Sequence, residues 1–209
     1  MAYSVHELFL TLQGEGHHAG RRAVFVRFSG CNLWSGREQD RASAICQFCD
    51  TEFVGTDGPG GGRFASADDL VAAIDRCWGD VDGPPFIVFT GGEPLLQLDR
   101  ALIDAAHGAG MLVAVESNGS IAAPDGIDWL TISPKAGAPW EQKSGDELKL
   151  VWPQDLDPES FLAHSFGSWR LQPKDGGDYE ANLKATIAYC LEHPPWQLCL
   201  QQHKICAMP

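Results

Sequence analysis

Three cysteines in the first quarter of the chain have the spacing of a metal-binding group. Cys31, Cys46 and Cys49 form the pattern C-x14-C-x2-C. Two thiols three residues apart in a loop can bind one metal ion or neighbouring irons of a cluster. A structural zinc site closes its shell with four ligands, whereas three protein ligands leave a position open for a small molecule. On spacing alone two interpretations remain: an iron–sulfur cluster with one open iron, or a zinc site completed by His17, His18 or a distant cysteine.

The elements that must position these thiols alternate between strands and helices. Apolar runs predict strands, and Ser66 with Asp69 forms a capping box at the start of a helix. This alternation is typical of a parallel α/β sheet. A full eight-fold barrel takes roughly 250 residues, so the shorter chain predicts an incomplete (β/α) barrel that is open on one side. The predicted strands are 24–28, 86–89, 112–116, 129–132, 148–151, 169–171 and 197–200, and the predicted helices are 67–77, 99–109, 158–164 and 179–192.

The segment from Asn32 to Ala65 is the least regular part of the chain. It is rich in Gly, Asp and Arg, and it contains Cys46, Cys49 and Thr51. Long loops inside compact domains are usually functional or disordered. We therefore expect its cysteine-bearing half to be an irregular cluster-binding loop, and the glycine run at 58–62 to be flexible.

Composition and charge restrict the class of protein. Hydrophobic residues make up 44% and charged residues 21% of the chain, which is typical of a globular protein. With 15 basic and 28 acidic residues the net charge is −13, a field that repels phosphate backbones, so we expect no nucleic-acid partner. The apolar runs are far shorter than the ~20 residues that span a bilayer, and residues 1–7 show no secretory signal. We expect one cytoplasmic domain over residues 1–209, with no membrane partner.

Nine short segments carry a resemblance to one enzyme family. The chain resembles the radical S-adenosylmethionine enzymes and, within that superfamily, the 7-carboxy-7-deazaguanine synthases. A single GGEP or LQGEG would be a weak signal, but nine segments in the family's order, from residue 9 to residue 204, cover nearly the whole chain. They are FLTLQGEG (9–16), VFVRFSGCNL (24–33), CQFCDT (46–51), TGGEP (90–94), ESNG (116–119), SPK (133–135), ELKLV (147–151), LQP (171–173) and QHK (202–204).

The cysteine spacing departs from the pattern of the superfamily. Its usual cluster motif is C-x3-C-x2-C, whereas here fourteen residues separate the first two cysteines. An insertion of eleven residues need not move the ligands, because a loop can extend outward while its ends stay close, and the entropic cost of closing a loop grows slowly with length. The departure therefore concerns the conformation of the loop more than the ligation of the cluster.

The resemblance implies a four-iron, four-sulfur cluster on the three cysteines, with S-adenosylmethionine chelating its open iron. Thiolates are the soft ligands that such clusters select. Turns after the predicted strands carry polar groups suited to the nucleoside cofactor, although Asn-Gly and Ser-Pro are also ordinary turn dipeptides. The residues assigned to S-adenosylmethionine are Phe48, Asp50, Gly92, Glu116, Ser117, Asn118, Ser133, Pro134, Lys135, Pro173, Lys174, Asp175 and Gly176.

The resemblance also implies a reaction, in which a radical lyase converts 6-carboxy-5,6,7,8-tetrahydropterin to 7-carboxy-7-deazaguanine with release of ammonia, within 7-deazapurine and queuosine biosynthesis. It implies Mg²⁺ bound by Thr51, the substrate carboxylate and waters, which suits an ion that takes few protein ligands. Without the resemblance Thr51 would be a turn cap. Arg27 interrupts an apolar strand and must face a polar group. The residues assigned to the pterin are Leu12, Gln13, Gly14, Glu15, Arg27, Thr90, His203 and Pro209.

Partners and rival functions complete the expectations. The chemistry needs an external electron donor, and the edges of an open barrel favour a homodimer. One rival is a radical activase that takes hydrogen from a glycine of a partner protein, which would leave the Gln13-Gly14-Glu15 segment without a role. The other rival is a non-catalytic zinc module held by Cys31, Cys46 and Cys49.

The remaining cysteines allow a second metal site near the C-terminus. Seven cysteines, an odd number, disfavour a disulfide framework. We expect Cys77, Cys190 and Cys199 to be small core residues instead. The alternative metal-binding group is Cys190, His193, Cys199, His203 and Cys206.

Overall fold

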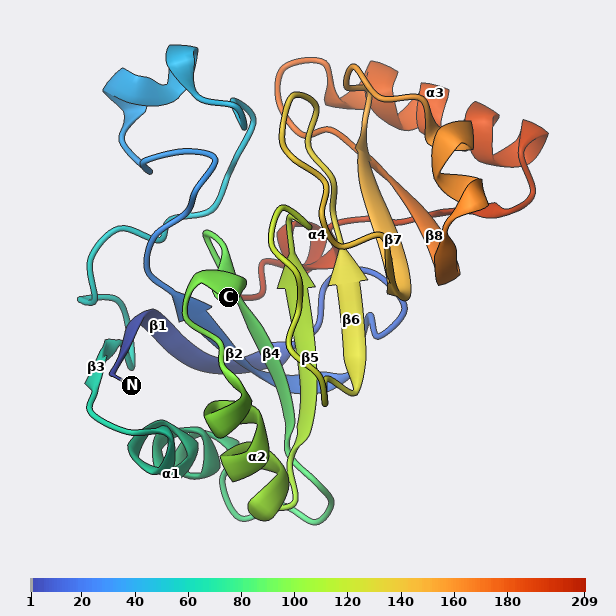
Figure 1. The fold of residues 1–209 in the computed structure, drawn as a ribbon. Helices are drawn as coiled ribbons and strands as arrows, with labels where there is room; N and C mark the ends of the chain where they lie inside the picture. The colour runs from blue at the N-terminus through green and yellow to red at the C-terminus, as the bar shows by residue number, and fades with distance from the viewer. Residues whose placement is uncertain (1) are drawn as a thin grey trace.

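One open sheet contains the nine strands of residues 2–209, the part of the chain that the computed structural model describes (Figure 1). The strand order is β3-β1-β2-β4-β5-β6-β7-β8-β9. β1 pairs with β2 and β3 in antiparallel fashion, and every neighbouring pair from β2 onward is parallel. The strands are β1 (Tyr3–Leu12), β2 (Arg22–Phe28), β3 (Gly62–Phe64), β4 (Phe86–Gly91), β5 (Leu112–Ser117), β6 (Trp129–Ile132), β7 (Ser144–Trp152), β8 (Ser165–Pro173) and β9 (Trp196–Leu198).

Helices cover the outside of this sheet in two places. α1 and α2 pack on each other and on β1, β2 and β5, while α3 packs on β8 and β9. The hydroxyl of Ser66 accepts a hydrogen bond from the amide of Asp69 at 3.2 Å, so α1 begins at the predicted cap. The helices are α1 (Ala67–Trp78), α2 (Arg100–Gly108), α3 (Tyr179–Glu192) and α4 (Gln202–Cys206), and the 3-10 turns are η1 (Glu38–Ser43), η2 (Pro94–Leu96) and η3 (Pro158–Ala163).

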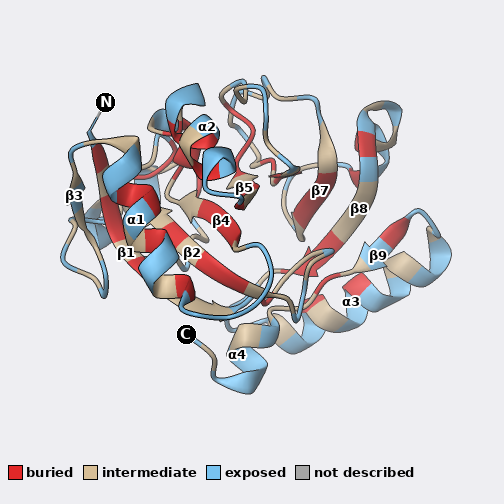
Figure 2. Cartoon of the chain, turned by 90° about the horizontal axis from the view of Figure 1, so that it is seen from below, coloured by how far each residue is buried: buried red, intermediate tan, exposed pale blue. Residues whose placement is uncertain are grey.

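The alternation of side chains along β2 separates the core from the interior of the barrel. Val24, Val26 and Phe28 are fully buried on the face that packs against the helices. Phe25 and Arg27 point the other way and line a cavity inside the barrel. Figure 2 shows the same division over the molecule, with buried residues concentrated in the strands and on the helix faces that cover them.

The predicted incomplete barrel is confirmed, because the sheet ends at β3 on one side and at β9 on the other. The predicted helix at 158–164 is only a 3-10 turn, and β1, β3 and α4 were not predicted. β1 escaped prediction because its pairing with β2 shifts register between Val5 and Glu7. A register shift of this kind interrupts the alternation of buried and exposed side chains that marks a strand in a sequence.

The glycine run at 58–62 is not the flexible loop expected from its composition. The amide of Gly58 donates to the carbonyl oxygen of His6 at 3.0 Å, and the amide of Leu8 donates to that of Pro59 at 2.8 Å. The run therefore packs along β1 and leads directly into β3.

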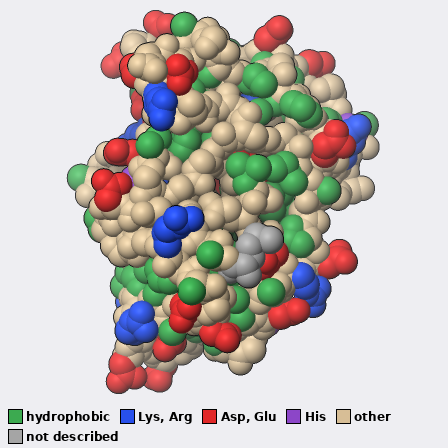
Figure 3. All heavy atoms as spheres, turned by 60° about the vertical axis from the view of Figure 1, so that its left-hand side comes forward, with side chains coloured by type: hydrophobic (Ala, Val, Ile, Leu, Met, Phe, Trp, Pro, Cys, Tyr) green, Lys and Arg blue, Asp and Glu red, His purple; other side chains and the backbone are tan. Residues whose placement is uncertain are grey.

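Charged side chains are dispersed over the face of the molecule shown in Figure 3. Lys and Arg side chains there stand singly among acidic and apolar ones. Across residues 2–209, no helix combines the length and the apolar character that a membrane span needs.

Candidate active site

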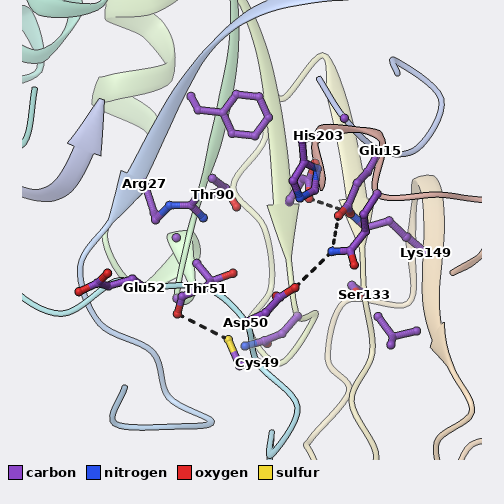
Figure 4. A pocket seen from close by; sticks show the side chains of 18 of the residues that line it. Glu15, Arg27, Cys49, Asp50, Thr51, Glu52, Thr90, Ser133, Lys149 and His203 are labelled. Carbon is purple, nitrogen blue, oxygen red and sulfur yellow. Dashed lines mark hydrogen bonds and ion pairs between the residues drawn. The ribbon is translucent and has the colours of Figure 1, made fainter. Parts of the chain in front are cut away.

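A cavity of about 500 Å³ runs into the barrel from the carboxyl ends of the parallel strands. Its size lies in the range of roughly 300–1,000 Å³ that small-molecule sites occupy. In Figure 4, Cys49 and Thr51 lie on one side of the cavity and Glu15, Lys149 and His203 on the opposite side. We call these two sides the cluster end and the floor.

At the cluster end, the three predicted cysteines all line the cavity. Cys31 follows β2, and the inserted segment returns to its starting point because Leu33 pairs with its far end. The carbonyl oxygen of Leu33 accepts hydrogen bonds from the amides of Ile45 at 3.1 Å and Cys46 at 3.3 Å. The long spacing between Cys31 and Cys46 therefore separates them in sequence and not in space.

At this end the Cys46 thiol is buried, the Cys31 and Cys49 thiols are half-buried, and the Cys46 and Cys49 thiols interact with the charge of Lys135. Burial raises the pKa of Cys31, whereas a hydrogen bond from the Cys46 thiol lowers the pKa of Cys49. Lys135 is half-buried, and this desolvation lowers the pKa of its ammonium, while the Cys46 and Cys49 thiols oppose that shift. Lys135 Nζ also donates to Ser133 Oγ at 2.8 Å. The positive charge of Lys135 thus faces the thiols, where it favours their anionic form.

The two glycines of the GGEP segment let the end of β4 approach Cys31. A Cβ atom added to Gly92 would lie 2.6 Å from the Cβ of Cys31 and would collide with the carbonyl oxygen of Gly30. Gly91 has a φ of +137°, a conformation that side chains rarely adopt. The segment therefore forms the turn expected of it, and its backbone packs closely against the loop that carries Cys31.

Glu93 is fully buried behind the cavity and joins the ends of β4 and β5. Its carboxylate accepts hydrogen bonds from the amide of Asn118 at 2.8 Å, the hydroxyl of Ser117 at 2.9 Å and the amide of Leu95 at 3.0 Å. Burial raises the pKa of Glu93 against these donors. The side-chain amide of Asn118 donates in turn to Asn32 Oδ1 at 3.1 Å, so the network continues to the cysteine loop.

The floor is built around Lys149 of β7. Its Nζ lies 2.5 Å from Glu15 Oε2 and 2.8 Å from Glu116 Oε2. Gln13 Nε2 donates to Glu116 Oε1 at 2.8 Å, and Gln201 Nε2 donates to Glu15 Oε1 at 3.0 Å. Burial would lower the pKa of Lys149, but the two carboxylates hold it well above its ordinary value. One ammonium between two carboxylates leaves the floor with a net negative charge, which favours a ligand that presents N–H donors.

The loop between β1 and β2 closes the amino-terminal end of the barrel and carries Gln13 and Glu15 at its start. The amide of His17 donates to Glu147 Oε2 at 2.7 Å, and its ring stacks on Trp129 at the start of β6, with 4.6 Å between ring centroids. These contacts fix the loop across the strands, so that its first residues face the cavity.

Arg27 has the polar partner that its place in an apolar strand required. Its Nε lies 2.6 Å from Glu7 Oε1 on the neighbouring strand β1. Both side chains and Thr90 line the cavity. The positive charge of Arg27 is therefore already balanced by the carboxylate of Glu7.

The segment after β9 covers the floor from outside. The amide of Gln202 donates to the carbonyl oxygen of Gly14 at 2.9 Å, and a side chain at Gly14 would collide with the imidazole of His203. Thr11 Oγ1 donates to the carbonyl oxygen of Pro209 at 3.2 Å, which brings the last residue of this sequence to the cavity.

Lys204 of α4 joins two loops at the cavity rim. Its Nζ forms ion pairs with Asp50, the residue after Cys49, and with Asp175 at 2.6 Å. Burial raises the pKa of Asp50, but Lys204 outweighs it and holds that pKa below its ordinary value. α4 thereby connects the cluster end to the loop that follows β8.

Three close relatives identify the family. The chain is 59% identical to the 7-carboxy-7-deazaguanine synthase of Caulobacter vibrioides over 210 aligned positions, which cover 100% of both chains. The chain belongs to the 7-carboxy-7-deazaguanine synthase family. The synthases of Bordetella pertussis and Burkholderia multivorans are 57% and 52% identical to it, each again over the full length of both chains.

A solved structure agrees with this membership of the 7-carboxy-7-deazaguanine synthase family. QueE from Escherichia coli has a TM-score of 0.72 and 26% identity, covering 97% of this chain and 95% of that one. No protein-family model matches the chain. The resemblance to radical S-adenosylmethionine enzymes and the fold class drawn from the sequence are both confirmed.

Nearly all the residues assigned from the family resemblance line the cavity. The three cysteines, Thr51 and every residue assigned to the pterin are among them, as are nine of those assigned to S-adenosylmethionine: Phe48, Asp50, Gly92, Glu116, Ser117, Asn118, Ser133, Lys135 and Asp175. Four of the assigned residues do not line the cavity: Pro134, Pro173, Lys174 and Gly176. The backbone of Lys174 is instead hydrogen-bonded to Trp152 and Asn182. The roles of all the assigned residues, inside and outside the lining, stay predictions.

Sequence reasoning missed Lys149, Gln201 and Lys204 in this member of the synthase family. Lys149 interrupts the apolar run at 148–151, the same signal that drew attention to Arg27. A charged side chain in a buried strand needs a polar partner, so the sequence could have predicted Lys149 as a site residue. Lys204 lies on α4 and Gln201 directly precedes it, and no local pattern indicates the position of this helix over the cavity.

The zinc site that used His17 or His18 is wrong. His18 contacts Phe86 at the start of β4, at the opposite end of the barrel from Cys31. In residues 2–209 no group of three or more Cys, His, Asp and Glu side chains could hold a single metal ion. A four-iron cluster places each thiolate on a different iron, so cysteines that surround a common cavity fit it without converging on one ion.

The second cysteine group is spread over different parts of the fold. Cys199 is buried inside the barrel, where its sulfur accepts a hydrogen bond from the amide of Gly16 at 3.1 Å. Cys190 and Cys77 are half-buried against the core, and Cys206 is exposed. Cys199 is therefore the core residue expected from the sequence, and Cys77 and Cys190 lie at the edge of the core.

Proposed function

We propose that this chain converts 6-carboxy-5,6,7,8-tetrahydropterin to 7-carboxy-7-deazaguanine with release of ammonia, as a radical S-adenosylmethionine lyase of 7-deazapurine and queuosine biosynthesis. Membership of the synthase family supports the assignment. The observation that carries it in the structure is one cavity with three cysteine thiols at one end and a hydrogen-bonding floor at the other. The two ends are suited to the two ligands that the reaction brings together.

Cys31, Cys46 and Cys49 would hold the cluster. A bound four-iron cluster with S-adenosylmethionine supplies the radical chemistry, while the protein supplies binding, orientation and exclusion of water. The thiols fit this role because they surround one end of the cavity and are partly or fully buried. The half-buried cation of Lys135 would offset part of the negative charge that three thiolates gather there.

We propose that the nucleoside cofactor lies along the carboxyl ends of β5 and β6. Ser133 and Lys135 present a hydroxyl and an ammonium to the cavity from the end of β6. Asn118, after β5, is fixed by its contacts with Glu93 and Asn32. Groups held in this way need little reorganisation when a ligand binds, which favours affinity and alignment.

The pterin would lie on the floor, with its donor edge toward Glu15. Lys149 pairs with the carboxylates of Glu15 and Glu116, whose oxygens can accept hydrogen bonds from ring N–H groups. We therefore place Glu116 at the pterin and not at S-adenosylmethionine, to which the resemblance assigned it. Gln13 and His203 add groups that can donate as well as accept. A site that pairs with every polar edge of a ring rejects analogues that lack one of them.

Mg²⁺ would bind at Thr51, on the cluster side of the cavity. Thr51 lines the cavity, and its hydroxyl has no hydrogen-bond partner in residues 2–209. One neutral oxygen suits Mg²⁺, which keeps several waters and would take the substrate carboxylate as a further ligand. The Arg27–Glu7 pair is already neutral overall, so the substrate carboxylate needs such an added cation.

We further propose an external electron donor, a homodimer and a cytoplasmic location for this one-domain chain. Exposed apolar side chains such as Leu191 on α3 and Ile205 on α4 are compatible with a contact between two copies. Sedimentation of the holoenzyme tests the dimer.

The test of the function is anaerobic purification followed by a complete assay. We expect iron and acid-labile sulfide at the stoichiometry of one four-iron cluster per chain. Adding reductant, S-adenosylmethionine, Mg²⁺ and the pterin should give 7-carboxy-7-deazaguanine, detected by its absorbance and mass. A colourless protein with stoichiometric zinc would support the zinc module. A reduced cluster that cleaves S-adenosylmethionine without binding the pterin would favour the activase.

A further inference from the structure

The segment inserted between Cys31 and Cys46 contains an arginine, Arg41, that contacts the turn carrying the second and third cysteines. Because Leu33 pairs with Ile45 and Cys46, the two ends of the insertion meet, and a much shorter connection would span the same gap. The extra residues form η1 outside the barrel. One of them, Arg41, reaches back to the turn that carries the second and third cysteines.

The guanidinium of Arg41 is held on several sides. One of its nitrogens, Nη1, donates to the carbonyl oxygen of Gln47 at 3.0 Å and to that of Cys49 at 2.9 Å. Nε pairs with Glu38 Oε2 at 2.7 Å, and the group lies over the ring of Trp34, 4.1 Å from its centroid. Bonds from a charged donor are stronger than neutral ones, and stacking on an aromatic face limits rotation of the guanidinium.

Trp34 is itself fixed, so the support extends into the fold. Its indole nitrogen donates to the carbonyl oxygen of Arg37 at 3.1 Å, and its ring meets Phe53 edge-on at 5.6 Å between centroids. Phe53 is fully buried. Gln47 adds a further link, because its side chain donates to the carbonyl oxygen of Ala42 at 3.2 Å.

We propose that Arg41 is a positioning residue for the iron–sulfur cluster. By binding the carbonyl of Gln47, between the two cysteines, and that of Cys49, it fixes the turn in which both thiols face the cavity. The proposal rests on the proposed function, since it assumes a cluster on these thiols. Partners that orient metal ligands contribute strongly to metal affinity. A fixed cation beside the cluster also stabilises the added electron of its reduced state, which raises the reduction potential.

The test compares Arg41→Gln and Arg41→Lys with the wild type and with Arg37→Gln. The control removes the same charge from the same insertion at an exposed side chain for which residues 2–209 offer no hydrogen bond or ion pair. Each protein is reconstituted anaerobically with iron and sulfide. Iron content, the rate of cluster loss to a chelator, the midpoint potential and the thermal unfolding temperature are then measured.

For Arg41→Gln we expect cluster loss roughly ten- to a hundredfold faster than in the wild type. We also expect a lower midpoint potential and an unchanged unfolding temperature. Arg41→Lys should lie between the two, because an ammonium keeps the charge but not the planar, stacked donor. Arg37→Gln should match the wild type.

Three results would overturn the proposal. The first is cluster loss in Arg41→Gln no faster than in Arg37→Gln. The second is a rate of cluster loss in Arg41→Lys equal to that of the wild type, which would assign the effect to charge and not to positioning. If Arg41→Gln does not fold, the same comparison of Arg41→Lys with the wild type tests the proposal. The third is a wild type that takes up zinc and no iron, in which case the proposed function fails first and this inference with it.

Discussion

The cluster end and the floor of the cavity hold their functional groups by different means. At the cluster end the cysteines stand on loops beyond the strands, and backbone bonds such as those to Leu33 and from Arg41 shape those loops. At the floor Lys149 and Glu116 project from strands of the sheet itself. Lys149 pairs with Glu15, which is 134 residues away in sequence, and its side chain is 6% exposed. Altering the cluster end should therefore remove function and keep the fold, whereas altering the floor should affect both.

The largest expected effect is that of Cys46→Ala on the cluster. We expect loss of the cluster and of turnover, as for Cys31→Ala and Cys49→Ala, because each thiolate holds a different iron. The unfolding free energy of the metal-free protein should change little. Iron and sulfide analysis with urea unfolding measures both. Cys206→Ala, at an exposed thiol, is the control. A full cluster in any of the three variants would remove that cysteine from the ligand set.

Lys149→Met tests the opposite case at the floor. It leaves the half-buried carboxylates of Glu15 and Glu116, 13% and 23% exposed, without their buried cation, and breaking such a pair costs about 3 kcal/mol or somewhat more of unfolding free energy. Urea unfolding at neutral pH measures the loss. Lys184→Met, at an exposed position on α3, is the matched control. A loss no larger than that of the control would mean that the floor does not support the fold.

The pH dependence of the same variant sharpens the comparison. Burial raises the pKa of Glu116, but Lys149 outweighs it and holds that pKa below its ordinary value. Its contribution to stability is therefore present above the ordinary glutamate pKa of about 4.3 and is lost as pH falls through the folded value. In Lys149→Met burial dominates, so stability should fall less steeply on acidification. Parallel pH profiles for variant and wild type would contradict this.

Thr51→Ala should have a smaller effect, confined to the metal. With one neutral ligand removed, we expect the Mg²⁺ concentration for half-maximal rate to rise roughly tenfold. Cleavage of S-adenosylmethionine without product should persist. Initial rates over a Mg²⁺ series measure the shift, and Thr51→Ser should restore the wild-type value because it keeps the hydroxyl. An unchanged Mg²⁺ response in the Ala variant would exclude Thr51 as a ligand.

The smallest expected effect is that of Lys204→Met on stability. Lys204 makes two ion pairs, as Lys149 does, but its side chain is 37% exposed and its aspartate partners are 46% exposed. Solvent screening reduces such pairs to about 1 kcal/mol or less. Urea unfolding of both lysine variants should therefore give clearly different losses. Equal losses would show that burial does not separate the floor from the rim.

The parts of the fold that the sequence predicted are those with an uninterrupted local pattern. The apolar runs at 86–89 and 129–132 are strands as expected, and Ser66 starts α1. β1 was missed because its register shift breaks the alternation, and α4 because five residues are too few for a helical period. The missed helix α4 and the residue before it bring Lys204 and Gln201 to the cavity, so this gap in the prediction hid part of the site.

The candidate site shows the same limit. The cysteines and the GGEP segment were readable because their spacing is local. The partnership of Lys149 with Glu15 and Glu116 was not, because it depends on which strands become neighbours. Arg41 could not have been found from any residue pattern, since its acceptors are backbone carbonyls, which every residue carries.

The division of side chains along β2 limits the changes that this strand can accept. Deleting or adding a single residue would reverse its faces, pressing the charge of Arg27 against the helices and placing Val26 in the ligand chamber. Variation in chain length must therefore fall outside such strands. The stretch between the first two cysteines, whose ends are joined at Leu33, can absorb it with the sheet undisturbed.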